Sequence, residues 1–246
     1  MGLVLTGLGM LLTGIAHSFV TAAMWRGLTG MGSGLSNVAV MGMMTAWFTA
    51  RRRGMALGIV VTGSSLGLIF VGPLIPRLLA VYGNGGWRTC WLLFGGVALG
   101  LALLCGLFLR NHPAEKGLLP FGAKPGEPMP ENQKKAIRWS AIYRSLPVWH
   151  LGVVYIAFGF SYVIYVTFFT KRLVAEGGYT AETAGNLLML LGWCSVFCGI
   201  IWGSVSDLIG RKWALMIVYL IHTVAFSLFA LWPAPPGFTI STILFG

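Results

Sequence analysis

The feature that most constrains this chain is a series of apolar stretches long enough to cross a bilayer. A bilayer-spanning helix needs about 20 mostly apolar residues. Seven stretches qualify, and an eighth begins near Gly237 and is cut short at Gly246. Since lipid offers the backbone no hydrogen-bond partner, helices are expected. We therefore predict an all-α polytopic membrane protein with seven full spans and a truncated eighth. The full spans are expected at roughly 1–19, 22–48, 54–82, 88–109, 147–169, 183–205 and 213–232.

Composition excludes several other classes of protein. Apolar residues make up 57% of the 246 and charged residues 9%, whereas a typical soluble domain is about 25% charged. A soluble enzyme, a disordered chain and a nucleic-acid-binding domain are all excluded, although the net charge is +11. No catalytic residues, cofactor or metal site are predicted. The four cysteines show neither a disulfide framework nor zinc spacing.

The basic residues gather in alternate loops. Twelve of the 17 lie between spans two and three, four and five, or six and seven. Because cytoplasmic loops carry an excess of Lys and Arg, we expect these loops inside the cell and the first span to start at the cytoplasmic face. The predicted location is the bacterial inner (plasma) membrane. The twelve are Arg51, Arg52, Arg53, Arg110, Lys116, Lys124, Lys134, Lys135, Arg138, Arg144, Arg211 and Lys212.

One long loop, residues 111–146, divides the chain. It holds five of the eleven prolines and three of the six acidic residues, a composition typical of a connector. We expect a partial N-terminal bundle of four spans at 1–110 and a partial C-terminal bundle of three spans and a stub at 147–246. The basic and apolar mixture at 132–145 suits either a helix on the anionic inner leaflet or a solvated linker.

Glycine pairs four residues apart recur inside the predicted spans. Small faces allow close helix packing in lipid. We favour static packing for these pairs, and sliding helices are the alternative. The pairs are Gly30 and Gly34, Gly54 and Gly58, Gly63 and Gly67, Gly96 and Gly100, and Gly199 and Gly203.

The clearest local motif lies at the predicted cytoplasmic end of the sixth span. Gly203 leaves room for a neighbouring helix, Asp207 has Arg211 four residues on, and Gly210 permits a tight turn before Lys212. A carboxylate at this depth is costly unless it is paired. A generic span end with a salt bridge is the alternative interpretation.

These residues resemble the loop motif G-x-x-x-D-x-x-G-R-K of the major facilitator superfamily. Leu208 stands where the family often has a cation, which matches the weaker copy of the motif between helices eight and nine. The segment from Arg26 to Gly34 resembles the helix-four motif R-x-x-x-G-x-G. The resemblance implies a two-bundle transporter fold of which this chain holds helices three to about ten. The monocarboxylate and organic-anion branch is the most similar one.

The resemblance also implies a solute cavity lined by helices one, four, seven and ten. Arg26 is a charged residue well inside a span, so it marks an anion site, a coupling site or a buried structural pair. Asn37 follows three turns later on a similar face. Both are candidate substrate-binding residues.

The fifth span carries Tyr155, Tyr162 and Tyr165 on one broad face. They are predicted either to line the cavity or to pack as aromatic side chains. Asn186 on the sixth span is a further candidate. His222 is interpreted as a packed, hydrogen-bonded residue.

The predicted function is secondary active transport of a small solute, an organic anion, by alternating access between two bundles. The alternative is a truncated or non-transporting membrane protein that retains the fold. No Asp or Glu lies deep in any span, so a coupling proton is left open, as is the oligomeric state. The sixth span lacks the aspartate and arginine of the animal monocarboxylate carriers, which argues against monocarboxylate as the solute. The expected partners are the solute and the lipid bilayer, and no nucleic acid.

Overall fold

The computed structural model describes residues 1–123 and 143–246, and the side chains of Ala50, Arg51, Asp207 and Arg211 are outside that description. Helices make up nearly all of these residues, which contain no strand beyond one isolated bridge. The prediction of an all-α membrane fold is confirmed. The helices are α1 (Gly2–Gly14), α2 (Phe19–Trp47), α3 (Ala50–Tyr82), α4 (Gly86–Phe108), α6 (Leu146–Ala175), α7 (Ala181–Ile209), α8 (Arg211–Leu231) and α9 (Pro235–Phe245), with short 3-10 turns η1 (Gly83–Gly85) and η2 (Pro113–Lys116).

Four segments of the described chain are long and apolar enough to span a membrane: 52–108, 146–175, 181–206 and 212–231. The first contains two helices, α3 and α4, because the chain reverses at η1. α2 has 29 residues but is not among the four, since Arg26, Asn37 and several hydroxyl side chains interrupt its apolar surface. α1 ends at Gly14, so it is about 20 Å long and shorter than the predicted first span.

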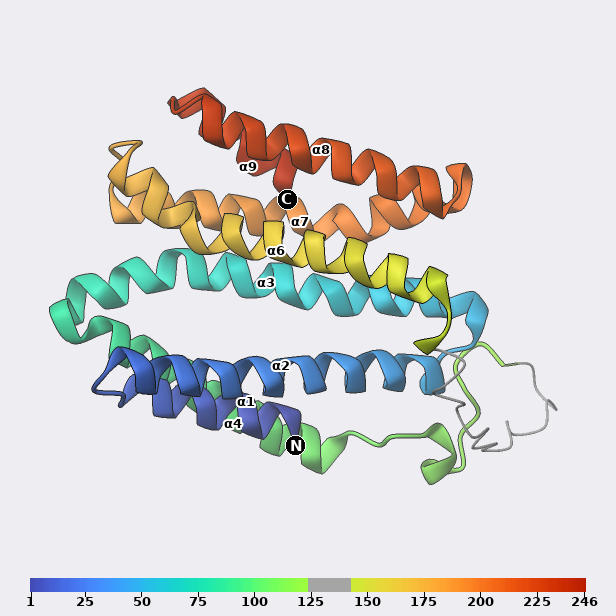
Figure 1. Ribbon diagram of the computed structural model, residues 1–246. Coiled ribbons are helices and arrows are strands. Elements are labelled where there is room, and N and C mark those ends of the chain that lie inside the picture. Colours follow the sequence, from blue (N-terminus) through green and yellow to red (C-terminus); the bar gives the residue numbers. More distant parts are fainter. Residues whose placement is uncertain (124–142) are drawn as a thin grey trace.

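Figure 1 shows successive helices running back and forth, so their connections alternate between two ends of the molecule. The turn between α2 and α3, the start of the connector and the turn between α7 and α8 lie at one end. The turns at 15–18, η1 and 176–180 lie at the other. The orientation predicted from the basic loops depends on this alternation.

Two arginines at the end with few cations hold helix termini together. The Arg88 guanidinium donates to the Ala16 carbonyl at 3.1 Å, just after α1. The Arg172 guanidinium donates to the Ala230 carbonyl in the last turn of α8 at 2.9 Å and forms an ion pair with Glu176 at 3.0 Å. Unpaired carbonyls at helix C-termini attract cations. These contacts explain why two arginines lie at the end of the molecule that otherwise carries few basic residues.

α3 packs along α7 in antiparallel orientation, through a contact that we call the α3–α7 seam. Gly72 faces Gly185, and a Cβ on Gly72 would lie 2.9 Å from the Met189 nitrogen. A Cβ on Gly192 would lie 2.9 Å from the Ser65 carbonyl oxygen, and a Cβ on Gly199 would lie 3.5 Å from Gly58 Cα. The small residues therefore recur every seven positions on both helices. They are Gly58, Ser65 and Gly72 on α3, and Gly185, Gly192 and Gly199 on α7.

α1 uses the same spacing on two faces. Gly2 and Gly9 face α2, where a Cβ on Gly9 would lie 2.9 Å from the Thr29 nitrogen. Gly7 and Gly14 face α4, where a Cβ on Gly14 would lie 3.1 Å from Leu92 Cγ. α1 is thus held closely on both sides and fixes α2 and α4 relative to each other.

The predicted packing of glycines four residues apart is wrong for most of the pairs. A Cβ would meet nothing within 4 Å at Gly30, Gly34, Gly54, Gly63, Gly67, Gly96, Gly100 or Gly203. A Cβ on Gly58 would also meet no atom of the described residues within 4 Å, whereas a Cβ on Gly199 would lie in ordinary contact with Gly58 at 3.5 Å. A step of four residues turns a helix about 40° past a full rotation, whereas a step of seven falls about 20° short of two rotations, so heptad spacing stays on a shared face for longer.

The start of the connector docks onto the turn between α2 and α3; we call residues 118–123 the docked segment. The Phe121 N–H donates to the Trp47 carbonyl at 2.7 Å, and the Thr49 N–H donates to the Phe121 carbonyl at 3.2 Å. The rings of Phe48 and Phe121 meet edge to face at 5.8 Å. The connector thus attaches to the N-terminal helices at a second point beyond the end of α4.

Gly122 makes this docking sterically possible. Its φ is +94°, a region that L side chains rarely adopt. A Cβ there would lie 2.7 Å from Thr49 Oγ1 and 3.0 Å from Arg52 Cγ. Gly117 also has a positive φ, +65°, but a Cβ there would meet no atom of the described residues within 4 Å. The suggested surface helix at 132–145 lies largely outside the described residues.

Candidate functional site

The predicted substrate-binding residues lie in two separate groups of helices. Arg26 and Asn37 are exposed on α2, and Asn186 is exposed on α7. Tyr155, Tyr162 and Tyr165 lie on α6. No contact found in the described part of the chain joins Arg26 to these tyrosines.

The guanidinium of Arg26 lies over the indole of Trp91, 4.5 Å from the ring centroid. Trp91 is half-buried on α4. An arginine over the face of a tryptophan is a favourable cation–π geometry. The contact reaches across α1, which packs against both helices. Sequence reasoning singled out Arg26 but not Trp91, because sequence spacing does not predict a contact between side chains 65 positions apart.

The three tyrosines of α6 have different surroundings. Tyr165 is 3% exposed, and its ring stacks on Phe245 of α9 with centroids 4.0 Å apart. Its hydroxyl donates to Ser241 Oγ at 2.8 Å, and Ser241 in turn donates to the Ala225 carbonyl at 2.7 Å. Tyr165 therefore occupies the aromatic core between α6, α8 and α9, as the packing interpretation expected.

Tyr162 and Tyr155 are more open. Tyr162 is 38% exposed; its ring stacks on Phe245 with centroids 5.6 Å apart and lies 6.0 Å from the Phe158 centroid. Tyr155 is 74% exposed, and its ring centroid lies 6.2 Å from that of Phe158. Only Tyr162 of the three lines the pocket described next.

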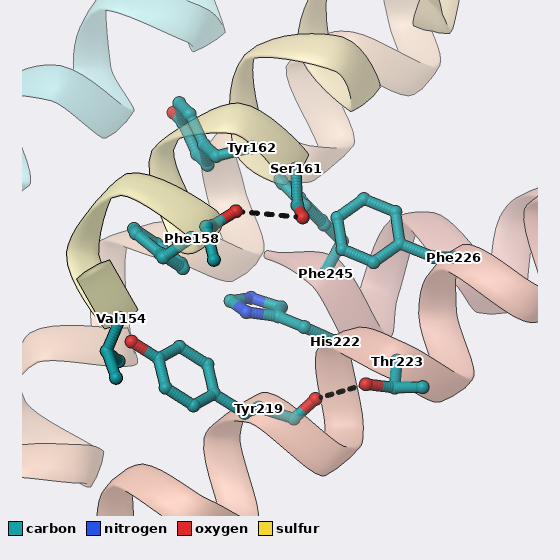
Figure 2. A pocket seen from close by; sticks show the side chains of 10 residues that line it. Val154, Phe158, Ser161, Tyr162, Tyr219, His222, Thr223, Phe226 and Phe245 are labelled. Atoms are coloured by element: carbon teal, nitrogen blue, oxygen red, sulfur yellow. Dashed lines mark hydrogen bonds between the residues drawn. The ribbon is translucent and has the colours of Figure 1, made fainter. Parts of the chain in front are cut away.

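A pocket of about 320 Å³ lies between α6 and α8, with Phe245 of α9 at its wall. Figure 2 shows the His222 imidazole in the middle of this pocket, near the ring of Phe158, which also contacts Tyr219 with centroids 5.8 Å apart. The imidazole stacks on Phe158 with centroids 5.9 Å apart and lies 5.0 Å from the Phe245 ring. The pocket is thus mainly aromatic, with an imidazole and two phenol rings among its walls.

Two hydroxyl groups in the pocket are already engaged with the backbone. Ser161 donates to the Ala157 carbonyl at 3.0 Å, and Thr223 donates to the Tyr219 carbonyl at 2.8 Å. Both are the i to i−4 bonds that such residues make inside helices. His222 also hydrogen-bonds the Phe245 backbone, so the rings of Tyr162 and Tyr219 and the rest of the imidazole are the groups in this pocket left to meet a ligand.

Sequence reasoning treated His222 as an isolated residue and missed its neighbours. Tyr219, His222, Thr223 and Phe226 stand at positions i, i+3, i+4 and i+7 of α8, so they share one helix face. That periodicity was readable in the sequence. The partner face on α6, which includes Phe158 and Tyr162, required the three-dimensional structure.

The loop motif spans the turn from α7 to α8. Gly210 has φ +86° and joins the two helices directly, which explains why glycine is needed there. Gly203 has open space around it, and Lys212 is exposed. The predicted pairing of Asp207 with Arg211 falls on side chains outside the described set.

The family model of the Major Facilitator Superfamily matches residues 1–246. The chain belongs to the major facilitator superfamily. The family resemblance read from the Arg26 and Gly203 motifs is confirmed. The curated relatives below carry transporter names.

The curated relatives in this superfamily are named for different solutes. The chain is 25% identical over 212 residues to a probable sulfoacetate transporter of Cupriavidus necator, covering 84% of this chain and 48% of the relative. It is 24% identical to the hexuronate transporter of Bacillus subtilis, covering 81% and 46%. It is 34% identical over 125 residues to monocarboxylate transporter 9 of Mus musculus, covering 50% and 23%. This chain spans about half the length of the first two relatives, as the expectation of helices three to ten requires.

Proposed function

We propose that this chain is part of a secondary transporter that carries a small organic anion across a bacterial inner membrane by alternating access. The observation that carries the proposal is Arg26. The six acidic residues of the chain are Glu115, Glu127, Glu131, Glu176, Glu182 and Asp207. None of them belongs to α1, α2, α3 or α4. A cation within a membrane-spanning bundle needs a counter-charge, and an anionic solute would supply one.

The relatives support the chemical class of the solute. Sulfoacetate and hexuronate, the solutes in two of their names, are anions with carboxylate or sulfonate groups. The planar guanidinium binds such groups through two parallel hydrogen bonds. We place Arg26 at the anionic group. Tyr162 and Asn37 are further candidates for polar contacts with the same solute.

The α3–α7 seam supports the proposed mechanism. It joins the α1–α2–α4 group to the α6–α8–α9 group through paired small residues, with Ile69 and Pro76 of α3 as the larger side chains nearest to Gly192 and Gly185. Two rigid groups joined in this way can rock against each other, which is the motion that alternating access requires. We assign the basic loops and the connector to the cytoplasmic side by the positive-inside rule.

Binding of glucuronate and of sulfoacetate to the purified chain in lipid nanodiscs tests the proposal. Arg26→Ala should weaken binding about 10- to 100-fold, which is the effect of losing charged hydrogen bonds. Arg77→Ala is the matched control, because Arg77 is also exposed on a helix of the same half and its loss changes the net charge equally. Equal weakening by both variants would mean non-specific attraction of anions. Unchanged binding in Arg26→Ala would remove Arg26 from the site.

The second candidate function is a membrane protein that retains the fold without transporting. The transporter names of the relatives belong to chains about twice as long as this one. The mass of the product in its own cell membranes separates the two candidates. A mass near 26.5 kDa, together with no uptake of either anion into proteoliposomes, would support this second candidate. A mass well above that value, together with uptake that Arg26→Ala abolishes, would support transport.

A further inference from the structure

The contact between Arg26 and Trp91 determines how the proposed anion site is oriented. A guanidinium is flat, and its N–H groups lie in its plane. When one face of that plane is held against an indole ring, the N–H groups stay free around its edge. The centroid distance of 4.5 Å is well within the about 6 Å range of cation–π attraction.

An arginine on an exposed helix face otherwise has many rotamers. Fixing such a side chain costs conformational entropy, which a ligand has to overcome each time it binds. The Trp91 ring reduces this cost because it holds the guanidinium before the anion arrives. Trp91 is itself half-buried on α4, and α4 is fixed by the close contacts of α1 at Gly7 and Gly14.

We infer that Trp91 is a positioning residue for anion binding: it holds the Arg26 guanidinium by a cation–π contact so that its N–H edge faces the carboxylate or sulfonate of the solute. The inference rests on the proposed function, since it assigns the orientation of the same site. It adds a residue on α4 to a site expected on other helices.

The competing interpretation is that the stack only ties α2 to α4. The packing of α1 already provides that tie on two faces, through Gly9 against Thr29 and through Gly14 against Leu92. A purely structural tryptophan would depend on the size and shape of its ring. A positioning tryptophan depends on the negative charge density of the ring face.

Fluorinated tryptophans separate the two interpretations, because fluorine withdraws electron density from the ring face while nearly preserving its shape. Mono-, di-, tri- and tetrafluorotryptophan would be incorporated at position 91 by nonsense suppression, and glucuronate affinity measured in nanodiscs. We expect affinity to fall stepwise with each fluorine, by about 3- to 30-fold over the series. The ring keeps its shape, so the series does not rely on a truncated variant folding.

Trp87 is the matched control on the same helix. Arg88 lies over its ring at 5.1 Å, but this guanidinium is committed to the Ala16 carbonyl. The same fluorinated series at Trp87 should leave glucuronate affinity unchanged. Equal stepwise losses at both positions would overturn the inference, because they would reflect a general effect of fluorination.

The outcomes distinguish the inference from the function on which it rests. If Arg26→Ala abolishes binding but the series at Trp91 leaves affinity constant, the positioning role is wrong and the anion site stands. If the unmodified chain binds neither glucuronate nor sulfoacetate, the proposed anion site fails and the positioning role fails with it.

Discussion

Replacing Gly192 with alanine tests the middle of the α3–α7 seam, where this glycine faces Ser65 and Ile69 of α3. The added Cβ would lie 2.8 Å from Ile69 Cγ1 and 2.9 Å from both the Ile69 nitrogen and the Ser65 carbonyl oxygen. Carbon atoms pack favourably at about 3.5–4.0 Å. The shortfall is therefore on the order of 0.6–1 Å, and two of the three obstructing atoms belong to the backbone of α3, which cannot move without the helix.

The expected cost follows from that shortfall. Overpacking a close contact destabilises by about 1–3 kcal/mol, and backbone obstruction places Gly192→Ala in the upper part of that range. Alanine recovers up to about 1 kcal/mol of helix propensity relative to glycine. The net loss of unfolding free energy should be about 1–2 kcal/mol.

The same helix supplies a graded series. Gly199→Ala would place its Cβ 3.5 Å from Gly58, an ordinary contact, and Gly203→Ala would meet nothing within 4 Å. The first should be nearly neutral, and the second neutral or stabilising by up to about 1 kcal/mol. Unfolding by SDS in bicelles, followed by far-ultraviolet circular dichroism, measures all three. If Gly203→Ala destabilises as much as Gly192→Ala, close packing at the seam is not the cause and the reasoning is refuted.

Two further predictions concern other contacts. Gly122→Ala should release the docked segment and speed deuterium exchange of the Phe121 amide, which donates to the Trp47 carbonyl, about tenfold or more. Gly117→Ala is the control, because Gly117 also has a left-handed φ but has open surroundings among the described residues. It should leave exchange of the Phe121 amide unchanged. Tyr165→Phe removes a donor to the buried Ser241 hydroxyl and should lower the unfolding free energy by about 0.5–1.5 kcal/mol in the SDS assay. Tyr162→Phe is the control, because the Tyr162 hydroxyl makes no hydrogen bond within the described residues, and it should leave the unfolding free energy unchanged. Equal losses in the two variants would contradict the assigned bond.

Hydrophobic length predicted the fold well, because every apolar stretch must become a helix in lipid. It was less accurate for α1, where apolar residues continue past Gly14 although the helix ends there. An apolar turn between helices has the same composition as the helices themselves. The motif around Gly203 predicted the family, since a turn between two spans needs particular residues at particular positions.

Helix contacts were much harder to predict than helices. Glycines at 30 and 34 have the same sequence signature as glycines that pack, and only the neighbouring helix decides which face is used. The site was predicted unevenly for the same reason. Arg26 was recognisable because charge in a span is costly, but Trp91 and the pairing of α6 with α8 depend on contacts between distant parts of the chain.

The α3–α7 seam has an approximate two-fold symmetry in its sequence spacing alone, because both helices carry small residues at the same interval and run in opposite directions. The middle pair, Ser65 and Gly192, lies at the centre of that symmetry, with Gly58 opposite Gly199 at one end and Gly72 opposite Gly185 at the other. The contacts themselves are uneven: Gly72 and Gly185 meet through their backbones, whereas a Cβ on Gly199 would still lie 3.5 Å from Gly58. The two helices therefore diverge from the Gly72 end toward the Gly58 end, so any change in their crossing angle is more restricted at the first end than at the second.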